Sequence, residues 1–403
     1  MLESIIMKVL QTISGLSAKS GGPSTCTHDL MEGLWDVNAH TDLLTVACAD
    51  STMHNLGEGR PWLKEVQNDY RTPFFISKNI QRYLRQSDYD LYHSNALWMG
   101  VNHDTCRIAR EKKKPYIISP HGMLYPTALK VHAWKKQILL KLWYNRDIRQ
   151  ATCLHATCQQ EAEYCRLFGY KGPIAVIPNA VVFPNFLQES SNDCKLQEPT
   201  GKKRIIGFLG RLHPIKKVEN VLYALYHLKH SENKVDISES LSFQIMGKYD
   251  DVYEQWLKEE TKRLGLEDCV EFVGFVNGKE KYDRLSRLSA LMVPSAQENF
   301  GMIVPEALIC GTPVYASLGT PWSELNSCHC GWWIDNTPQT IAEVIKEILY
   351  TPKEQLALMG ANGHKLMAEK YEQHKVAAMM KRLYEWIVVD KLTIEKKPKF
   401  VYE

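Results

Sequence analysis

Short apolar runs alternate with longer amphipathic segments along the whole chain, and this alternation constrains the fold more than any other feature. It is typical of βα units arranged around a parallel sheet. In the first half we expect strands at residues 5–13, 43–47, 91–94, 116–119, 153–156 and 174–177. In the second half we expect strands at residues 205–209, 242–246, 270–273, 290–293 and 313–316, and then a final amphipathic helix over 375–388.

A polar, turn-rich stretch at residues 183–204 interrupts the alternation and is typical of a linker. The 403 residues also exceed one typical core and fit two domains of roughly 150–200 residues. We therefore predict an α/β protein with domains at residues 1–185 and 204–372, joined by a linker at 186–203. The cleft between two such domains is a preferred place for a ligand.

Composition narrows the class of protein. A formal net charge of +3 gives no indication of nucleic-acid binding. Apolar runs are shorter than the roughly 18–20 residues of a transmembrane helix, and the N-terminal segment is expected to form a buried strand rather than a signal peptide. Eleven cysteines without framework spacing are typical of reduced thiols, which predicts a cytoplasmic protein.

Two cysteine-rich segments invite comparison with a metal site. Cys153, Cys158 and Cys165 accompany His155, and the second segment is Cys328-His329-Cys330. Neither contains the paired C-x2-C knuckles of a structural zinc site. We therefore expect buried or half-buried thiols, with metal binding as the alternative.

The segment PSAQENFGMIVPEAL contains two glutamates, Glu298 and Glu306, eight positions apart. Gly301 and Pro305 argue against one continuous helix, because proline suits only a first turn. We expect a loop up to Pro305 and a helix from there. Glu306 then lies in the first turn, where the helix dipole favours a carboxylate. Glu298 lies in a loop after a strand, where ligand contacts of α/β proteins concentrate.

The segment GFLGRLHPIKKVENVL predicts a strand, a tight turn and a helix. Arg211 lies in the turn, and Lys216 and Lys217 open the helix. Cations placed there would converge on an anion that the helix N-terminus already favours, which suits a diphosphate. The alternative is that Lys216 and Lys217 belong to a solvated helix face.

Two further motifs follow strands in the first half. SGLSAKSGGPSTC places Gly21 and Gly22 before an expected helix, where a phosphate or sugar could approach the backbone closely. This loop matches neither the dinucleotide fingerprint nor the P-loop. SPHGML places His121 directly after a strand. The alternative to a functional role for His121 is a histidine bonded into its own turn.

Together these motifs resemble the retaining glycosyltransferases of family 4. The glutamate pair, Arg211 and Lys216 in GRLHPIK, the SGGPS loop and PNAV at residues 178–181 occur in the family's order along essentially the whole chain. The resemblance implies the GT-B fold, in which two Rossmann-like domains with parallel sheets face each other across a cleft. It also implies that the final segment, residues 373–403, packs back on the first domain.

The resemblance implies a role for each motif residue. Arg211 and Lys216 would neutralise the diphosphate of a nucleotide-sugar donor, and Glu306 would bind its ribose. Glu298 and His121 would face the donor hexose. The other residues expected beside the donor or acceptor are Gly21, Gly22, Asn299, Phe300, Gly301 and Met302.

The chain departs from the family pattern at three positions. Lys217 and Asn299 stand where the family often has glycine, and Ala180 stands in PNAV where the family has PNG. Asn299 bears on which donor sugar fits. Ala180 requires only an ordinary backbone angle.

The expected chemistry is cleavage of a sugar–phosphate bond, which leaves negative charge on the departing diphosphate. Fixed cations stabilise that charge, so Arg211 and Lys216 can replace a metal. We therefore expect neither metal nor cofactor, with Asp88 and Asp90 in DYD as the alternative metal ligands. The resemblance favours same-face attack, which retains configuration, over a covalent carboxylate intermediate.

The predicted function is transfer of a hexose from a nucleotide-diphosphate donor to a glycan or lipid-linked acceptor in cell-surface polysaccharide synthesis. Family frequency favours a UDP-sugar donor, with GDP-mannose next. The alternatives are a sugar-nucleotide epimerase of the same fold and a non-catalytic nucleotide-sugar-binding protein. A phosphorylase would be longer and would carry a pyridoxal-phosphate lysine.

Residues 128–151 combine lysines and arginines with tryptophans and leucines in one expected helix. Such a helix can rest on an anionic membrane surface, which would place a cytoplasmic enzyme on the inner membrane face. The alternative is a domain helix whose apolar side faces the core and whose lysines face water.

Overall fold

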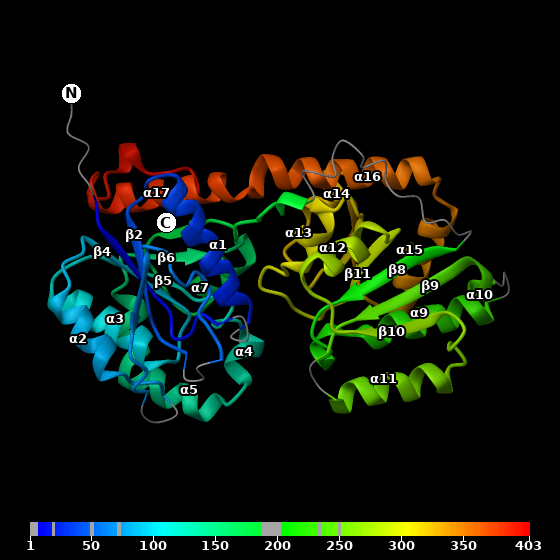
Figure 1. The fold of residues 1–403 in the computed structure, drawn as a ribbon, viewed down its shortest axis with the longest axis horizontal. Coiled ribbons are helices and arrows are strands. Elements are labelled where there is room, and N and C mark those ends of the chain that lie inside the picture. The colour runs from blue at the N-terminus through cyan, green and yellow to red at the C-terminus, as the bar shows by residue number, and fades with distance from the viewer. Residues whose placement is uncertain are drawn as a thin grey trace. The chain divides into compact units, whose positions relative to one another are not determined.

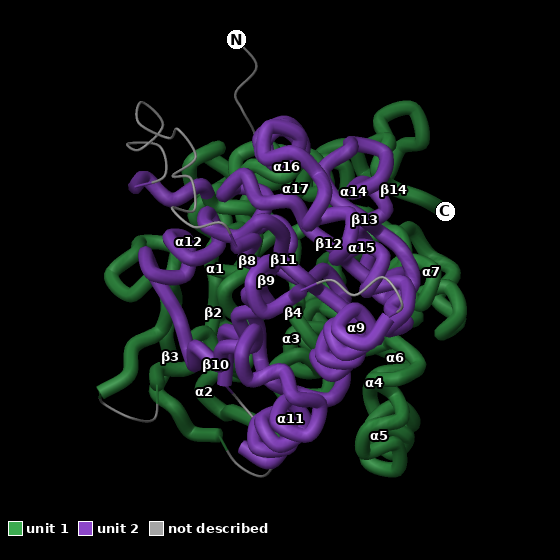
Figure 2. Tube along the Cα trace, turned by 90° about the vertical axis from the view of Figure 1, so that its right-hand side faces the viewer, with its two compact units in different colours: residues 1–182, 371–403 green, residues 183–370 purple. Residues whose placement is uncertain are grey.

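The computed structural model describes residues 7–17, 21–48, 52–70, 74–186, 203–231, 236–248 and 251–403. The chain divides into two compact units, which Figure 2 shows in different colours. Unit 1 comprises residues 1–182 and 371–403, and unit 2 comprises residues 183–370. The predicted linker lies almost entirely outside the described residues.

Unit 1 is built on a sheet whose described strands follow the order β14-β7-β6-β5-β4-β1-β2-β3 (Figure 1). All neighbours are parallel except β14, which pairs antiparallel with β7. The strands are β1 (Val9–Thr12), β2 (Thr41–Val46), β3 (Leu63–Val66), β4 (Leu91–Asn95), β5 (Tyr116–Ser119), β6 (Cys153–Ala156), β7 (Ile174–Val176) and β14 (Val401–Tyr402). The helices are α1 (Gly22–Asp36), α2 (Lys78–Gln86), α3 (Gly100–Glu111), α4 (Pro126–Lys130), α5 (Ala133–Leu139), α6 (Asn145–Arg149), α7 (Gln159–Leu167) and α17 (Gln373–Val388).

The two faces of this sheet support separate cores, because successive strand residues point to opposite sides. Val9, Leu91 and Ile117 pack with α1 and α17 on one face. Their neighbours Leu10 and Tyr92 pack with α2, α3 and α7 on the other. The C-terminal helix α17 is therefore part of unit 1 and covers a face of its sheet.

Unit 2 is built on a parallel sheet of order β10-β9-β8-β11-β12-β13. Its strands are β8 (Arg204–Leu209), β9 (Leu241–Met246), β10 (Val270–Gly274), β11 (Ala290–Val293), β12 (Val314–Ser317) and β13 (Gly331–Ile334). Its helices are α9 (Val218–His230), α10 (Ile237–Ser240), α11 (Asp251–Arg263), α12 (Gly278–Ser286), α13 (Ile303–Ile309), α14 (Glu324–Ser327), α15 (Pro338–Tyr350) and α16 (Lys353–Leu366).

Each sheet has a point where the strand order reverses, between β1 and β4 in unit 1 and between β8 and β11 in unit 2. Helices α9, α11 and α15 pack into one core on unit 2, while α13 contacts β11, β12, α12 and α16. In doubly wound sheets, ligands bind at the carboxyl ends of the strands at this reversal. The loops after β8 and β11 are therefore the first place to look for a site in unit 2.

Eleven strands were predicted from the sequence, and the structure has a strand at each of those places. Three short strands were missed, β3, β13 and β14, and each lies at the edge of a sheet. Edge strands are covered less completely, and β3, with the sequence LKEV, lacks the continuous apolar run of a central parallel strand. β13, with the sequence GWWI, is apolar, so this reason does not apply to it. The predicted strand at residues 5–13 was too long, because β1 covers only Val9–Thr12 and residues 1–6 lie outside the described part.

The prediction of one helix over residues 128–151 was wrong. The chain forms α4, α5, a π-helical turn at Leu140–Tyr144 and α6. Between α4 and α5, Val131 is extended and His132 has a left-handed backbone with φ 50°, which ends the first helical segment. Among the described residues, no helix combines the length and apolarity needed to cross a bilayer.

Candidate active site

Two glycines at the ends of β8 and β9 let the backbones of these strands touch. A Cβ atom on Gly247 would lie 1.8 Å from the carbonyl oxygen of Gly210. Both glycines have φ values that other residues rarely adopt, 152° at Gly210 and 150° at Gly247. Arg211, one of the predicted diphosphate ligands, follows Gly210 directly and is exposed.

Lys216 and Glu298 meet where the strand order of unit 2 reverses. The Lys216 ammonium lies 2.5 Å from Glu298 Oε1, and the two side chains are only 14% and 12% exposed. Ser295 Oγ donates to the same carboxylate oxygen at 2.7 Å. This contact was not predicted, because the sequence assigned the two residues to different parts of a donor. A lysine ammonium has three protons, so Lys216 can hold Glu298 and still donate to an anion.

The local backbone structure positions the Lys216 side chain beside the Glu298 carboxylate. Lys216 ends a 3-10 turn, Pro214–Lys216, which His213 caps by accepting a hydrogen bond from Ile215 N at 3.2 Å. Ile215 in turn accepts a hydrogen bond from Ala296 N at 2.8 Å, which ties the loop after β8 to the loop after β11. The position of Lys216 thus depends on both loops.

The neighbouring lysine points to a different partner. Lys217 has a left-handed backbone with φ 54°, and its ammonium lies 3.4 Å from Glu219. Glycine adopts such a backbone without steric cost, which explains physically why glycine suits this position in the family. Ala180 also stands where the family has glycine. Its φ is not positive, and its side chain is buried.

The apolar part of the glutamate segment anchors the loop in the core of unit 2. Phe300 is 5% exposed, and its ring centroid lies 5.0 Å from that of Trp322. The Phe300 carbonyl accepts a hydrogen bond from Trp322 Nε1 at 2.5 Å. Asn299 and Met302, on either side, are half-buried. The loop that carries Glu298 is therefore held on its inner side by an aromatic pair.

Gly301, with φ 75°, turns the chain into α13. This helix begins at Ile303, so the predicted start at Pro305 was two residues late. Pro305 is still compatible with the helix, because the N–H groups of a first turn have no intrahelical partner. Glu306 lies in this first turn, as predicted.

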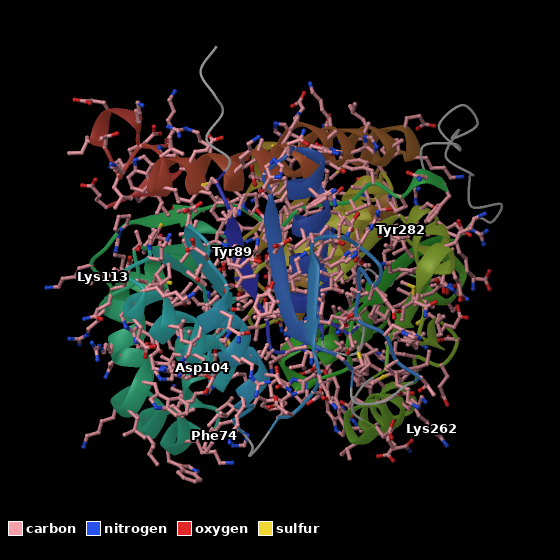
Figure 3. All side chains as sticks on the ribbon, turned by 60° about the vertical axis from the view of Figure 1, so that its left-hand side comes forward. Phe74, Tyr89, Asp104, Lys113, Lys262 and Tyr282 are labelled. Atoms are coloured by element: carbon pink, nitrogen blue, oxygen red, sulfur yellow. The ribbon has the colours of Figure 1, made fainter. Side chains whose placement is uncertain are left out.

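Glu306 also pairs with a lysine. Its Oε1 lies 3.0 Å from Lys281 Nζ on α12, and both side chains are about one-fifth exposed, 21% and 20%. Lys281 lies over the ring of its neighbour Tyr282, labelled in Figure 3, at 4.6 Å from the centroid. The sequence analysis missed Lys281 because it is one of several charges in GKEKYDRLSR, and only the packing of α12 against α13 singles it out.

A cavity of about 330 Å³ in unit 2 adjoins the loop of Glu298. Glu298 N donates to Gly319 O at 2.9 Å, and Gly319 belongs to the cavity wall. Apart from Lys217, its lining residues carried no signal in the sequence; they are Asn220, Ala296, Ser317, Leu318, Gly319, Asp335 and Asn336. The loops after β11, β12 and β13 thus contribute to the surroundings of Glu298.

The predicted residues of unit 1 lie at the carboxyl edge of its sheet. Gly21, with φ 88°, and Gly22 begin α1 after β1, and His121 follows β5 with φ 50°. His121 Nε2 lies 3.3 Å from Asn95 Oδ1 at the end of β4. Asn95 Nδ2 donates to Gln11 Oε1 at 2.8 Å. The alternative of a histidine bonded into its own turn is thus not what the structure shows.

A row of buried polar side chains crosses four neighbouring strands of unit 1. Tyr384 of α17 lies 3.0 Å from Gln11 Nε2 and 2.8 Å from His93 Nδ1. His93 Nε2 lies 2.6 Å from Ser119 Oγ, which lies 2.6 Å from His155 Nδ1. Single polar residues in short strands gave no sign of this row, which exists only once the sheet and α17 assemble. Through Gln11 and Asn95 it reaches His121.

These contacts also account for His155 in the cysteine segment. His155 Nε2 lies 2.8 Å from the carbonyl oxygen of Ile177. Cys153 and Cys165 are buried and Cys158 is half-buried, as expected for thiols. No group of three or more metal-ligating side chains occurs among the described residues.

The alternative metal ligands in DYD lie at the other edge of the first sheet. Lys114 Nζ is 3.4 Å from Asp88 and 3.6 Å from Asp90, and Lys8 N donates to Asp90 at 3.0 Å. Asp88 lines a cavity of about 560 Å³ at the amino ends of β1, β2 and β4. His121 and Gly22 lie at the opposite, carboxyl ends of the strands, so Asp88 and Asp90 do not belong to the same site.

Burial keeps the histidines of this row neutral, and this predicts a pH dependence of stability. Burial lowers the pKa of His93 well below its usual value, that of His121 to about 3 and that of His155 to about 4. Unfolded histidines have a pKa of about 6.5. Below that pH the unfolded chain binds protons that the folded chain does not, so stability is present above pH 6.5 and is lost as the pH falls.

For three such histidines we expect the free energy of unfolding to fall by up to roughly 4 kcal/mol per pH unit below about pH 6. Urea unfolding at a series of pH values measures this slope. His155→Gln should remove about a third of it, whereas His54→Gln, at a 64% exposed side chain, should leave it unchanged. An unchanged slope in His155→Gln would contradict the assignment.

Two doubly wound units, with a lysine and a glutamate meeting at the strand reversal of the second, agree with the GT-B fold that the motifs of the sequence implied. Comparison with family models identifies the family of glycosyltransferases. Residues 20–182 match the family described as Glycosyltransferase Family 4, and residues 192–366 match Glycosyl transferases group 1. The chain belongs to this family of glycosyltransferases.

Individual proteins are similar over shorter or longer parts. A GDP-mannose-dependent alpha-(1-6)-phosphatidylinositol dimannoside mannosyltransferase of Mycobacterium tuberculosis is 30% identical over 95 residues, which are 23% of this chain and 24% of the relative. Human alpha-1,3/1,6-mannosyltransferase ALG2 is 24% identical over 52% of this chain and 50% of the relative. The matches thus span between about a quarter and a half of these relatives' length.

A solved structure is similar over nearly the whole chain. Anabaena Alr3699/HepE, in complex with UDP and glucose, has a TM-score of 0.68 and 17% identity, covering 94% of this chain and 99% of that one. At this identity the likeness confirms the predicted fold and does not extend to a substrate.

Proposed function

We propose that this glycosyltransferase moves a hexose from a nucleoside-diphosphate donor to a glycan or lipid-linked acceptor in cell-surface polysaccharide synthesis, with retention of configuration and without a metal. The observation that carries the proposal is the Lys216–Glu298 pair at the strand reversal of unit 2. This is where doubly wound folds bind nucleotides. The buried thiols of Cys106, Cys153, Cys165 and Cys269 support a reducing, cytoplasmic setting.

The pair suits a leaving diphosphate. As the sugar–phosphate bond breaks, negative charge grows on the phosphate oxygens. Glu298 holds Lys216 in place, so little reorganisation is needed when that charge appears. Arg211, exposed after β8, would supply the second cation. Two fixed cations do the work that a divalent metal does in other phosphate sites.

Retention needs either a covalent carboxylate intermediate or attack on the face from which the phosphate leaves. We propose same-face attack, in which a departing phosphate oxygen takes the proton of the acceptor hydroxyl. His121 would hydrogen-bond the donor hexose as a neutral imidazole, because burial lowers its pKa to about 3. It then needs no protonation change in the working pH range, and Asn95 would orient its ring.

The relatives differ in donor. One mannosyltransferase relative is named for GDP-mannose, whereas the Anabaena structure contains UDP and glucose. We keep a UDP-sugar as the first expectation and GDP-mannose as the second. Asn299, half-buried between Glu298 and Phe300, is the residue we expect to influence which sugar fits.

The test is incubation with a panel of UDP-, GDP- and ADP-sugars, following release of nucleoside diphosphate with and without acceptors and with EDTA. Acceptor-dependent release with one nucleotide, unaffected by EDTA, is the expected result. Interconversion of the sugar without an acceptor would identify an epimerase. Tight donor binding without turnover on any acceptor would identify a binding protein. Loss of activity in EDTA that manganese restores would point to metal ligands instead.

Glu306 offers a sharper prediction for donor binding. Glu306→Ala removes a carboxylate expected to accept hydrogen bonds from ribose and leaves Lys281 without its partner. We expect the Kd for the nucleoside diphosphate to rise by about 10- to 100-fold, since hydrogen bonds to a charged group contribute roughly 1.5–3 kcal/mol. Calorimetric titration measures this.

Glu324 provides the matched control. It is a first-turn glutamate on α14 and pairs with Lys370 at 2.6 Å, as Glu306 pairs with Lys281. Glu324→Ala should leave the Kd within about twofold. Equal effects of the two substitutions would exclude a ribose contact at Glu306.

A further inference from the structure

The segment after β5 exposes an apolar face on unit 1. We call Val131, Trp134, Ile138 and Leu142 the outer stripe. Their exposed fractions are 57%, 66%, 50% and 65%. Single exposed apolar residues are ordinary, but Trp134, Ile138 and Leu142 recur every four residues along one helical stretch, which places them on one face. Val131 precedes that stretch. Helix α5, which carries the centre of the outer stripe, lies at the periphery of unit 1 in both Figure 1 and Figure 2.

The opposite side of this segment is fixed in the core. Leu139, Tyr144 and Ile148 are buried in the cluster that includes β4 and β5. Tyr144 OH donates to Met99 O at 2.6 Å, and Trp143 stacks on a histidine ring at 4.7 Å. The segment cannot turn the outer stripe inward without losing these contacts. The alternative interpretation, a domain helix whose apolar side faces the core, therefore accounts for the buried side of the segment. It does not account for the exposed apolar residues of the outer stripe.

Cations surround the outer stripe. Residues 112–149 contain one carboxylate, Asp147, whose side chain is 0% exposed and lies between Arg110 and His103. After β5, the exposed cations are Lys130, Lys135, Lys141, Arg146 and Arg149. None of these five forms an ion pair with any carboxylate that the structure describes. Within residues 112–149, the exposed charges are thus all positive.

We propose that the outer stripe inserts into the interfacial region of an anionic lipid bilayer. Trp134 and the aliphatic side chains would enter the acyl boundary, while the lysines extend to the headgroups. A lipid partner fits better than a protein, because lysine is depleted at the centres of protein interfaces. Anionic headgroups attract each basic residue that lies near the membrane surface.

This inference deepens the proposed function, on which its consequence for the acceptor rests. The outer stripe begins at Val131, ten residues after His121. Contact with a bilayer would bring a lipid-linked acceptor to the unit that contains this histidine. The contact itself depends only on the surface and can be tested without any turnover.

The test is co-sedimentation of the full chain with vesicles of phosphatidylglycerol and phosphatidylcholine in equal parts, against vesicles of phosphatidylcholine alone. We expect binding to the anionic vesicles in about 50 mM salt and its loss in about 500 mM, because salt screens surface charge. The double substitution Trp134→Ser with Leu142→Ser should lower the partition coefficient at least about tenfold, and Lys141→Glu at least about fivefold.

Matched controls exist on the same chain. Leu167, 78% exposed on α7, and Val252, 80% exposed on α11, are apolar residues outside the outer stripe. Leu167→Ser with Val252→Ser should leave partitioning unchanged. Lys262→Glu, at an exposed lysine of α11 labelled in Figure 3, should also leave partitioning unchanged. This substitution changes the net charge of the protein by the same amount as Lys141→Glu. Circular dichroism checks that each variant is folded.

Equal binding of the stripe and control variants, or no binding to anionic vesicles, would overturn the inference. Self-association that Trp134→Ser abolishes would show that a second copy covers the outer stripe and would overturn it too. Nucleoside-diphosphate release without vesicles is measured on the same variants. Turnover without vesicle binding overturns this inference alone, whereas vesicle binding without turnover on the full donor panel overturns the proposed function alone.

Discussion

Lys216→Ala should lower kcat/KM for the donor by about 10²- to 10³-fold, the loss typical when one group that stabilises transition-state charge is removed. Lys216 lies 2.5 Å from Glu298 in a site where both side chains are mostly buried, so solvent cannot replace its charge. The effect should fall mainly on kcat, because negative charge on the diphosphate grows as the bond breaks. Steady-state kinetics with the donor found in the panel measure it.

The adjacent lysine is the matched control for this prediction. Lys217 has the same charge and lies one position away, but its ammonium pairs with Glu219 rather than Glu298. Lys217→Ala should change kcat/KM by less than about threefold. Comparable losses in the two variants would show that general positive charge at the start of α9, and not the position of Lys216, is what matters.

A double-mutant cycle tests whether Lys216 and Glu298 act together. Glu298→Gln keeps a hydrogen-bond acceptor for Lys216 and Ser295 but removes the charge. If Glu298 holds Lys216 in place, the double variant should lose no more than about threefold beyond Lys216→Ala alone, because residues that act as a unit are not additive. Fully additive losses would mean that Glu298 acts on the sugar independently of Lys216.

Gly247→Ala should destabilise unit 2 by at least about 3 kcal/mol, among the larger effects of a single substitution. The new Cβ would lie 1.8 Å from the carbonyl oxygen of Gly210, a backbone atom that cannot move aside as a flexible side chain can. Relief of this clash would push apart the ends of β8 and β9 and displace Arg211. We therefore expect loss of donor binding together with a lower unfolding midpoint in urea.

Gly265→Ala separates the clash from ordinary backbone strain. Gly265 also has a positive φ, 62°, but an added Cβ there meets no atom within 4 Å. Its cost should be limited to about 1 kcal/mol for a left-handed backbone, and donor binding should be unchanged. Similar destabilisation in both variants would mean that the close approach of Gly247 and Gly210 contributes little.

The central strands and the site motifs could be predicted because they depend on local patterns. β5, β6 and β11 appear in the sequence as short apolar runs, since strands buried on both faces need apolar residues throughout. The edge strand β3 escaped notice for the opposite reason, because its sequence LKEV contains two charged residues. The division of residues 128–151 into separate helices depends on a left-handed His132 and a π-helical turn, which periodicity alone does not reveal.

Periodicity and residue chemistry are local properties, so the chain alone was enough to predict the βα alternation, the two-domain plan and the charged residues proposed for the site. Which of these residues pair with each other depends on the assembled fold. Lys216 and Glu298 are 82 positions apart and meet because β8 and β11 are neighbours in the sheet. Gln11 and Tyr384 are 373 positions apart and meet because α17 packs on the first sheet. Such contacts depend on strand order and helix packing, which no segment encodes alone.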